Sequence, residues 1–247
     1  MIDVIILAGG DSRGLLEGGD SSQPKSLLPI KGKAMLGYVL EALESCPVIG
    51  KKVLVGPKIV QEKLGESVEF FVEGGDNIFN NVTMGLQVLP PRGKVLVVTS
   101  DIPLLTREAL EDFLYRCEGK EAELYYPIIR KEDNERKYPD NKRTYVRLRE
   151  GVFTGGNIFL IDPPVVSRSV DLAQKIITLR KKPLHLAGVL GWLFVCKFIL
   201  GRLTIEELEK RVSSLLNIKA ASIVTPYPEI GVDIDKPSDL SLVNYLN

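Results

Sequence analysis

The sequence predicts an α/β fold in which a parallel sheet carries helices on both faces. In the first half of the chain, short apolar runs alternate with amphipathic helical patterns, which is typical of strand–helix–strand units. Two of the apolar runs end in residues suited to ligand binding, at the strand ends where such sheets bind ligands. With 247 residues and 45% hydrophobic content, the chain can build a sizeable core.

The first half contains four predicted strands and three predicted helices. The strands are Val4–Leu7, Val53–Val55, Glu69–Val72 and Val95–Thr99, and the helices are Met35–Glu44, Ile78–Leu89 and Thr106–Arg116. Thr106 is a suitable N-cap for the last helix, which has an apolar stripe at helical spacing.

The second half is less regular. Strands are predicted at Glu123–Arg130, Thr144–Leu148 and Asn157–Ile161, and helices at Asp171–Arg180, Ala187–Leu200 and Thr204–Leu216, the last with a Thr204/Glu207 capping box. The almost entirely polar stretch Lys131–Arg143 predicts an exposed loop. Because there is no internal repeat or Gly/Ser linker, residues 1–247 are interpreted as a single domain.

Composition excludes several classes of protein. The 32 basic residues balance the 32 acidic ones, so a basic surface for nucleic acid is not indicated. Cys46, Cys117 and Cys196 are far apart and are interpreted as buried residues of a protein in a reducing compartment. The apolar stretch Leu184–Leu200, at roughly 17 residues, is interpreted as a buried helix with Trp192 in the core rather than as a membrane span. Without a leading signal peptide, a cytoplasmic location is expected, and the single histidine, His185, is interpreted as structural.

The strongest local signal is the loop after the first strand. Leu7–Gly14 reads LAGGDSRG, and Gln23–Leu36 follows with Lys25. Glycines let backbone N–H groups approach anionic oxygens, and the cations Arg13 and Lys25 would neutralise them. This segment therefore predicts a polyphosphate site.

The order of these parts resembles the opening of the MobA-like nucleotidyltransferases, which join a nucleoside monophosphate from NTP to a phosphorylated acceptor. The resemblance implies a three-layer α/β/α fold with a mixed, mostly parallel sheet, similar to the nucleotide-diphospho-sugar transferases. It assigns the N-terminal half, about 1–120, to NTP and the C-terminal half, about 121–247, to the acceptor. The family usually spaces its arginine and lysine more closely than Arg13 and Lys25, so Leu15–Gln23 is a longer phosphate loop or a lid, or Arg13 is not the family arginine.

Two acidic segments predict a metal site. Asp101 ends a buried run and either holds Mg²⁺ or caps the following helix. In GVDIDKPSDL (Gly231–Leu240), Asp233 and Asp235 are two apart and on a strand would point the same way; the alternative is a turn with solvated acids. The resemblance makes Asp101 one ligand of Mg²⁺ and Asp235 the second, with Asp233 in reserve.

The resemblance also implies binding residues. Those for the nucleotide are Leu7, Ala8, Gly9, Gly10, Arg13, Lys25, Asn80, Asn81, Thr83 and Ser100. Those for the acceptor are Gly155, Gly156 and Asn157. From the residues alone, Asn80, Asn81 and Thr83 could equally cap a helix, and the glycine pair could form a hairpin turn.

The catalytic residues implied are Arg13, Lys25 and Asp101, which would support in-line transfer with release of pyrophosphate. GTP and CTP are the candidate donors, and the resemblance favours GTP. The expected partners are NTP and a small phosphorylated acceptor, without nucleic acid or membrane, in a monomer or homodimer. The alternatives are a glycosyltransferase that consumes a nucleotide-sugar, a non-catalytic nucleotide sensor and a purely structural protein.

Overall fold

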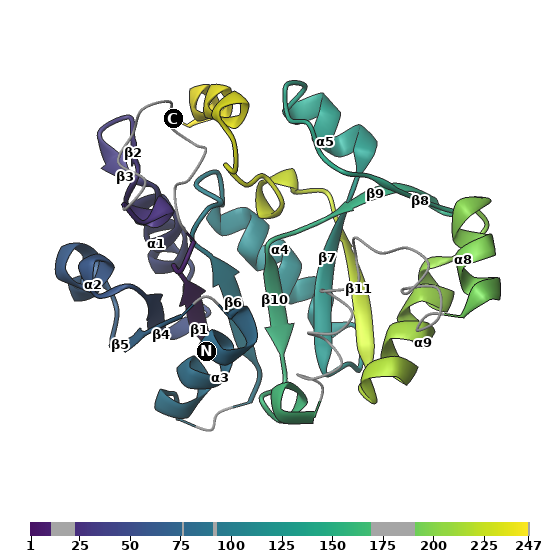
Figure 1. Ribbon diagram of the computed structural model, residues 1–247, viewed down its shortest axis with the longest axis horizontal. Helices are drawn as coiled ribbons and strands as arrows, with labels where there is room; N and C mark the ends of the chain where they lie inside the picture. Colours follow the sequence, from purple (N-terminus) through teal and green to yellow (C-terminus); the bar gives the residue numbers. More distant parts are fainter. Residues whose placement is uncertain (11–22, 76, 91–92, 169–190, 247) are drawn as a thin grey trace.

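The computed structural model describes residues 1–10, 23–75, 77–90, 93–168 and 191–246. Its centre is a nine-stranded sheet in which the order β5-β4-β1-β6-β10-β7-β9-β8 forms one path and β11 pairs with β7 (Figure 1). The strands are β1 (Ile2–Leu7), β4 (Ile49–Gly56), β5 (Phe70–Glu73), β6 (Val95–Thr99), β7 (Leu124–Arg130), β8 (Val146–Leu148), β9 (Gly151–Gly155), β10 (Ile158–Ile161) and β11 (Ala220–Thr225).

The strands that the N-terminal half contributes to this sheet run parallel. β1 lies between β4 and β6, with Ile5 opposite Val53 on one side and Val97 on the other. The carboxyl ends of β1 and β6, at Leu7 and Thr99, therefore meet at one edge of the sheet. That edge is where α/β sheets bind ligands.

The strands of the C-terminal half make the sheet mixed. β10 is antiparallel to both β6 and β7, whereas β11 runs parallel to β7. β9 pairs antiparallel with the carboxyl end of β7, with Thr154 opposite Ile129. β8 pairs antiparallel with the other side of β9. The mixed sheet agrees with the expected fold.

Helices cover both faces of this sheet. On one face, α1 (Met35–Ser45), α2 (Lys58–Leu64) and α4 (Arg107–Glu118) pack against alternate β1 residues, including Val4 and Ile6. On the other face, α3 (Ile78–Val88) packs against Ile5 and Leu7. Further along that second face, α9 (Ile205–Leu216) packs against β7, β9 and β11. The three-layer α/β/α prediction is confirmed.

The prediction of an exposed loop over Lys131–Arg143 was wrong for its first seven residues, while residues 138–143 contain no helix or strand. Residues Lys131–Lys137 form helix α5, which lacks an apolar stripe and is held by charge instead. Acids occupy its first turn and bases its last, and Lys131 pairs with Glu135 at 3.5 Å across one turn. This charge order stabilises a helix without hydrophobic periodicity.

The interpretation of Leu184–Leu200 as a buried helix with Trp192 in the core was also wrong for the part described. Helix α8 (Trp192–Ile199) packs on the core through Phe194, while Trp192 is 67% exposed and Ile199 is 74% exposed. A short helix on the outside of the sheet can bury only one of its sides. Asp171–Arg180 and His185 lie outside the described residues.

Other predictions agree with the structure. Thr204 and Glu207 form the capping box of α9, and Cys46 and Cys117 are buried. The expectation that Cys196 is buried was wrong, because it lies on α8 and is partly exposed there. Across the described part of the chain, every helix is too short or too polar to cross a lipid bilayer. The remaining short elements are β2 (Pro29–Ile30), β3 (Lys33–Ala34) and the 3₁₀ turns η1 (Lys25–Leu27), η2 (Gly65–Ser67), η3 (Pro228–Ile230) and η4 (Pro237–Tyr245).

Candidate functional site

The site lies where β1 and β6 end. The Ser100 amide donates to the Leu7 carbonyl at 3.0 Å, which joins the two strand ends. Asp101 follows directly, and the Thr99 hydroxyl donates to its Oδ1 at 2.6 Å. This bond fixes the direction in which the Asp101 carboxylate points.

A backbone hydrogen bond brings the C-terminal segment to the same place. The Ile234 amide donates to the Asp101 carbonyl at 3.0 Å. Val232 and Ile234 are fully buried, so Asp233 and Asp235 turn the other way, toward Asp101. The two aspartates point the same way as predicted, although residues 232–235 form no strand.

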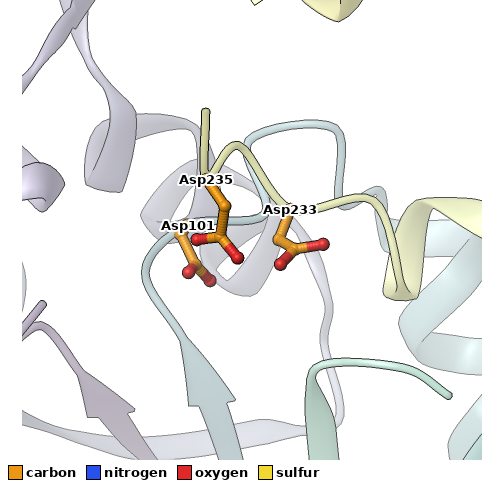
Figure 2. A group of neighbouring side chains, drawn as sticks. All are labelled: Asp101, Asp233 and Asp235. Carbon is orange, nitrogen blue, oxygen red and sulfur yellow. The ribbon is translucent and has the colours of Figure 1, made fainter. Parts of the chain in front are cut away.

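The three carboxylates face a common space. Figure 2 shows Asp101, Asp233 and Asp235 converging, and one oxygen of each lies within 4.8 Å of the others. Asp239 supports this arrangement from the first turn of η4, because its Oδ2 accepts from the amides of Asp235 at 3.0 Å and Lys236 at 3.1 Å. The cluster is therefore held in place at the end of β6 and at the first turn of η4.

Lys25 places its ammonium among these carboxylates. Its amide donates to the Gly10 carbonyl at 3.0 Å, which anchors η1 beside the glycine loop. Its Nζ lies 2.6 Å from Asp101 Oδ2 and also pairs with Asp235, although the Lys25 side chain is only 7% exposed. Burial acts to lower the pKa of Lys25, but the two carboxylates outweigh it and hold the pKa above its usual value.

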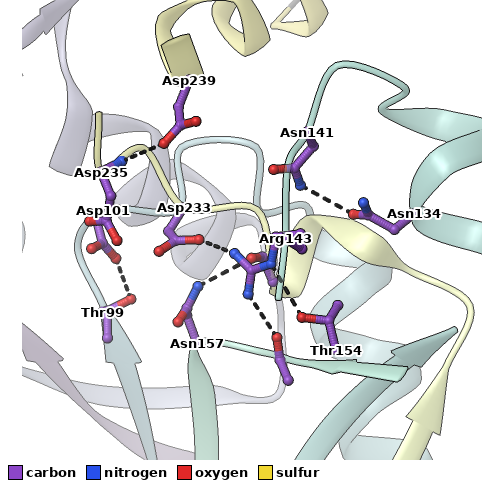
Figure 3. Close-up of polar contacts among 12 residues, drawn as sticks. Thr99, Asp101, Asn134, Asn141, Arg143, Thr154, Asn157, Asp233, Asp235 and Asp239 are labelled. Carbon is purple, nitrogen blue, oxygen red and sulfur yellow. Dashed lines mark hydrogen bonds and ion pairs between the residues drawn. The ribbon is translucent and has the colours of Figure 1, made fainter. Parts of the chain in front are cut away.

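Arg143 is a site residue that the sequence analysis missed. Its guanidinium pairs with Asp233 and donates to the Gly155 carbonyl at 2.9 Å and to Thr154 Oγ1 at 3.4 Å (Figure 3). Upstream, the buried Asn141 amide donates to Asn134 Oδ1 at 3.2 Å and so fixes the turn that leads to Arg143. The available signal was a basic residue directly before a predicted strand.

The aspartates at 233 and 235 titrate as a pair. Burial, together with the neighbouring carboxylates, raises the pKa of Asp233 to about 6 against the opposing effect of Arg143. Burial also acts to raise the pKa of Asp235, but hydrogen bonds from Asp233 and Lys25 outweigh it and lower that pKa. The surroundings therefore shift the pKa values of these two carboxyl groups in opposite directions.

Two cavities meet at the carboxylates. The first, of about 210 Å³, is lined by Leu7, Gly9, Gly10, Lys25, Gly75, Ile78, Asn81, Thr99, Ser100 and Asp101. The second, of about 270 Å³, is lined by Asn141, Lys142, Arg143, Thr144, Thr154, Asp233, Asp235, Lys236 and Asp239. Lys25 bridges them, because Asp101 lines the first and Asp235 the second.

Some of the residues expected to bind the nucleotide line the first cavity, and others do not. Leu7, Gly9, Gly10, Lys25, Asn81 and Ser100 line the first cavity. The Asn81 amide holds the Gly75 turn with bonds of 2.7 and 2.9 Å, and the Thr83 hydroxyl donates to the Phe79 carbonyl within α3. Ala8 is buried, Asn80 is exposed in the first turn of α3, and Arg13 lies outside the described residues.

None of the three residues expected to bind the acceptor lines the second cavity, although the preceding Thr154 does. A Cβ on Gly155 would lie 1.8 Å from the Tyr126 hydroxyl, and one on Gly156 would lie 2.6 Å from Ile230. Asn157 donates from Nδ2 to the Gly231 carbonyl at 3.3 Å. Packing therefore accounts for both glycines, and the Gly155 carbonyl also positions Arg143.

The carboxylate cluster fits a magnesium ion. Mg²⁺ prefers oxygen ligands and is commonly held by one or two carboxylates together with substrate phosphates. Asp101, Asp233 and Asp235 supply such oxygens at the junction of two cavities. Both Asp233 and Asp235 are therefore candidate partners of Asp101.

Comparison with known proteins identifies a family match. The sequence model of the MobA-like NTP transferase domain family matches residues 4–186 of this chain. A solved structure described as a hypothetical transferase from Thermus thermophilus shares 39% sequence identity and superposes with a TM-score of 0.84, covering 97% of this chain and 99% of that one.

Two curated relatives match over shorter stretches. A 2-C-methyl-D-erythritol 4-phosphate cytidylyltransferase from Bacteroides thetaiotaomicron is 36% identical over 115 residues, which cover 43% of this chain and 51% of the relative. A bifunctional protein GlmU from Exiguobacterium sibiricum is 37% identical over 94 residues, covering 36% of this chain and 21% of the relative. The matched region thus spans about half or less of these relatives.

Proposed function

The chain belongs to the MobA-like NTP transferase family, and we propose that it transfers a nucleoside monophosphate from NTP to a small phosphorylated acceptor with release of pyrophosphate. The observation that carries this proposal is the junction of two cavities at Asp101, Lys25 and Asp235. A transferase needs two substrates whose reacting atoms meet, and this junction gives them a common boundary.

The first cavity suits the nucleotide. Its glycine loop offers backbone N–H groups at the end of β1, and Gly9 and Gly10 are exposed there. Asn81 and the Gly75 turn close the side nearest α3. We assign the phosphates to the Gly9–Gly10 side, within reach of Lys25, while Arg13 remains a predicted contact of the leaving pyrophosphate.

The second cavity suits a polar, anionic acceptor. Lys142, Arg143 and Lys236 bring positive charge to it, and Thr144, Thr154 and Asn141 bring hydrogen-bonding groups, which together favour a phosphate with hydroxyl groups nearby. The acceptor phosphate would attack the α-phosphorus in line from this side, so that pyrophosphate leaves on the other.

The residues of this chain contribute position and charge. Thr99 and the Ile234 amide hold Asp101 in place, and Asp239 holds the backbone of Asp235. Mg²⁺, when bound by these carboxylates, would supply positive charge against the phosphate oxygens. Lys25 would neutralise charge at the α-phosphate. No covalent nucleophile is required.

The nucleobase is the finer part of the proposal. The opening LAGG segment favours GTP, whereas the similarity to a cytidylyltransferase favours CTP. The two donors would differ at the Asn81 and Gly75 side of the first cavity.

Pyrophosphate release tests the proposed function. The full chain is incubated with Mg²⁺, each of the four NTPs and a panel of sugar, polyol and pterin phosphates. One NTP–acceptor pair should release pyrophosphate, and Lys25→Ala should lower the rate by about 10²-fold, the scale for a lost electrostatic stabiliser. Lys63→Ala on α2 is the matched control and should keep the rate. Release that is equally fast in Lys25→Ala would remove Lys25 from the mechanism, and release of a nucleoside diphosphate from a nucleotide-sugar would favour glycosyl transfer.

A further inference from the structure

The position of the Lys25 ammonium affects how the site can bind a divalent cation and a nucleotide. Its Nζ contacts Asp101 and Asp235 at once, 2.6 Å from Asp101 Oδ2. These are the carboxylates that the proposed function assigns to a divalent cation. An ammonium and a divalent cation cannot occupy the same carboxylate oxygens together, because like charges at such distances repel strongly.

We propose that Lys25 is the resident counter-ion of the carboxylate cluster, and that it must leave the cluster before the carboxylates take up a divalent cation. The phosphates of NTP receive the released ammonium. The nucleotide and the cation therefore bind together, and the cation binds weakly by itself. This inference rests on the proposed function and describes its regulation.

The charges of the cluster support this exchange. Three carboxylates face two cations, Lys25 and Arg143, so the cluster is largely neutralised by the chain itself. The guanidinium of Arg143 is held by Asp233, Gly155 and Thr154. The ammonium of Lys25 is held by the two carboxylates alone among the described residues.

The first cavity provides space into which the Lys25 side chain can move. Lys25 lines the first cavity, and its stem passes beside Gly10, where an added Cβ would lie 3.7 Å from Lys25 Cδ. The ammonium can therefore turn from the carboxylates to the phosphate end of that cavity while η1 keeps its place. A flexible four-carbon stem with a compact charge suits such a movement better than the planar fork of arginine.

The proposal predicts the direction in which the affinity for the divalent cation changes when Lys25 is removed. A purely supportive role for Lys25 would not predict an increase in that affinity. If Lys25 competes with the cation, its removal strengthens binding of the cation alone and weakens binding of NTP. The favourable coupling between NTP and the cation must then fall by the same factor for both ligands.

Binding of Mn²⁺ without nucleotide tests this directly, since Mn²⁺ favours the same oxygen ligands and can be followed by electron paramagnetic resonance. Wild type, Lys25→Met and Lys25→Ala are titrated, with circular dichroism to verify folding. Both variants should bind Mn²⁺ at least about fivefold more tightly than wild type, within the usual range of coupling between sites. Lys142→Ala is the matched control, because it removes a charge from the second cavity and makes no ion pair with the three carboxylates in the described structure.

A smaller gain in the Lys25 variants would overturn the proposal, and so would an equal gain in Lys142→Ala, which would reflect net charge alone. A second measurement on wild type needs no variant to fold. Saturating NTP should increase the Mn²⁺ affinity of the protein above the affinities of free NTP and of the protein without nucleotide. Equal Mn²⁺ affinity with and without NTP would also overturn the proposal. Neither failure would affect pyrophosphate release by wild type, which tests the proposed function separately.

Discussion

At the scale of single residues, the site is organised by charges that are only partly exposed to water. The Asp101 side chain is 23% exposed and that of Lys25 is 7% exposed, whereas Asp235 is 63% exposed. Burial strengthens the ion pair between Lys25 and Asp101 most, and it makes an unpaired charge at either residue costly. Removing one charge without changing shape is therefore the most informative kind of substitution here.

Asp101→Asn is the first such test. Asparagine keeps an oxygen that can accept from the Thr99 hydroxyl but removes the negative charge next to Lys25. We expect pyrophosphate release to fall by about 10²- to 10³-fold, as for other electrostatic groups that act on the transition state. Asp140→Asn, at an exposed position, is the control and should retain the rate. A rate within threefold of wild type in Asp101→Asn would remove this carboxylate from catalysis.

Arg143→Ala tests the assignment of the second cavity. If Arg143 binds the acceptor phosphate, its loss should raise the KM for the acceptor by about tenfold or more, since hydrogen bonds to charged groups contribute about 1.5–3 kcal/mol. The KM for NTP should change by less than about twofold. Arg143→Lys should recover little, because one ammonium cannot meet Asp233, Gly155 and Thr154 together.

The control is Arg136→Ala, because Arg136 lies on the exposed side of α5 with 76% of its side chain accessible. Steady-state kinetics with each substrate varied in turn separates the two KM values. Equal increases in both would show that Arg143 supports the whole site rather than the acceptor.

At the scale of elements, the site depends on segments whose sequences carry little hydrophobic pattern. α5 is a helix because its charges match its dipole and pair across its turns, and the segment after it is fixed by two buried amides, Asn134 and Asn141. The spacing of apolar residues does not predict such a helix. Buried polar pairs cannot be recognised in the sequence, because they form only when the fold brings the two residues together. This is why Lys131–Arg143 was interpreted as a loop and Arg143 was missed.

Gly155→Ala tests whether the glycine turn serves packing. A methyl group there would overlap the Tyr126 hydroxyl, so β7 and β9 would have to separate. We expect a loss of about 1–3 kcal/mol in the free energy of unfolding, the range for overpacking. Gly119→Ala at the end of α4 is the control, because its Cβ would meet only a carbonyl at 3.7 Å.

Chemical denaturation of both variants gives the comparison. If Gly155→Ala is as stable as wild type yet loses affinity for the acceptor, the glycine serves binding after all. The predicted order is the reverse: stability falls first, and kinetic effects follow through displacement of Arg143.

At the scale of the whole molecule, the strand ends could be predicted and their distant partners could not. The glycine loop after β1 and Asp101 after β6 were found because neighbouring parallel strands end at one edge of a sheet. The approach of Asp235 depends on the Ile234–Asp101 backbone bond and on the burial of Val232, which involve contacts between distant parts of the chain. Sequence spacing carries no information on such contacts, so only the family resemblance suggested them.

Neither β9 nor β11 was predicted from the sequence. β9 begins with Gly151, which has a φ of 144°, and β11 pairs with a strand about a hundred residues earlier in the chain. Short strands of this kind are recognised by their partners rather than by their own composition.

A thermal-shift screen tests the whole arrangement at once, because a ligand that binds only the folded state stabilises every element that forms its site. The full chain is heated with each of the four NTPs, with and without Mg²⁺. One NTP with Mg²⁺ should raise the free energy of unfolding by about 2.7 kcal/mol when its concentration is a hundredfold above its dissociation constant. The matching nucleoside should give little shift, since it lacks the phosphates that Lys25 would contact in the first cavity.

The same screen on Asp101→Asn should lose most of the Mg²⁺-dependent part of the shift, because one of the three converging carboxylates is gone. The Asp140→Asn control should shift as wild type does. A chain that responds to none of the four NTPs would contradict nucleotide binding in the first cavity. A response to NTP that Mg²⁺ leaves unchanged would contradict the role of Asp101 and Asp235 as its ligands, while leaving the nucleotide assignment in place.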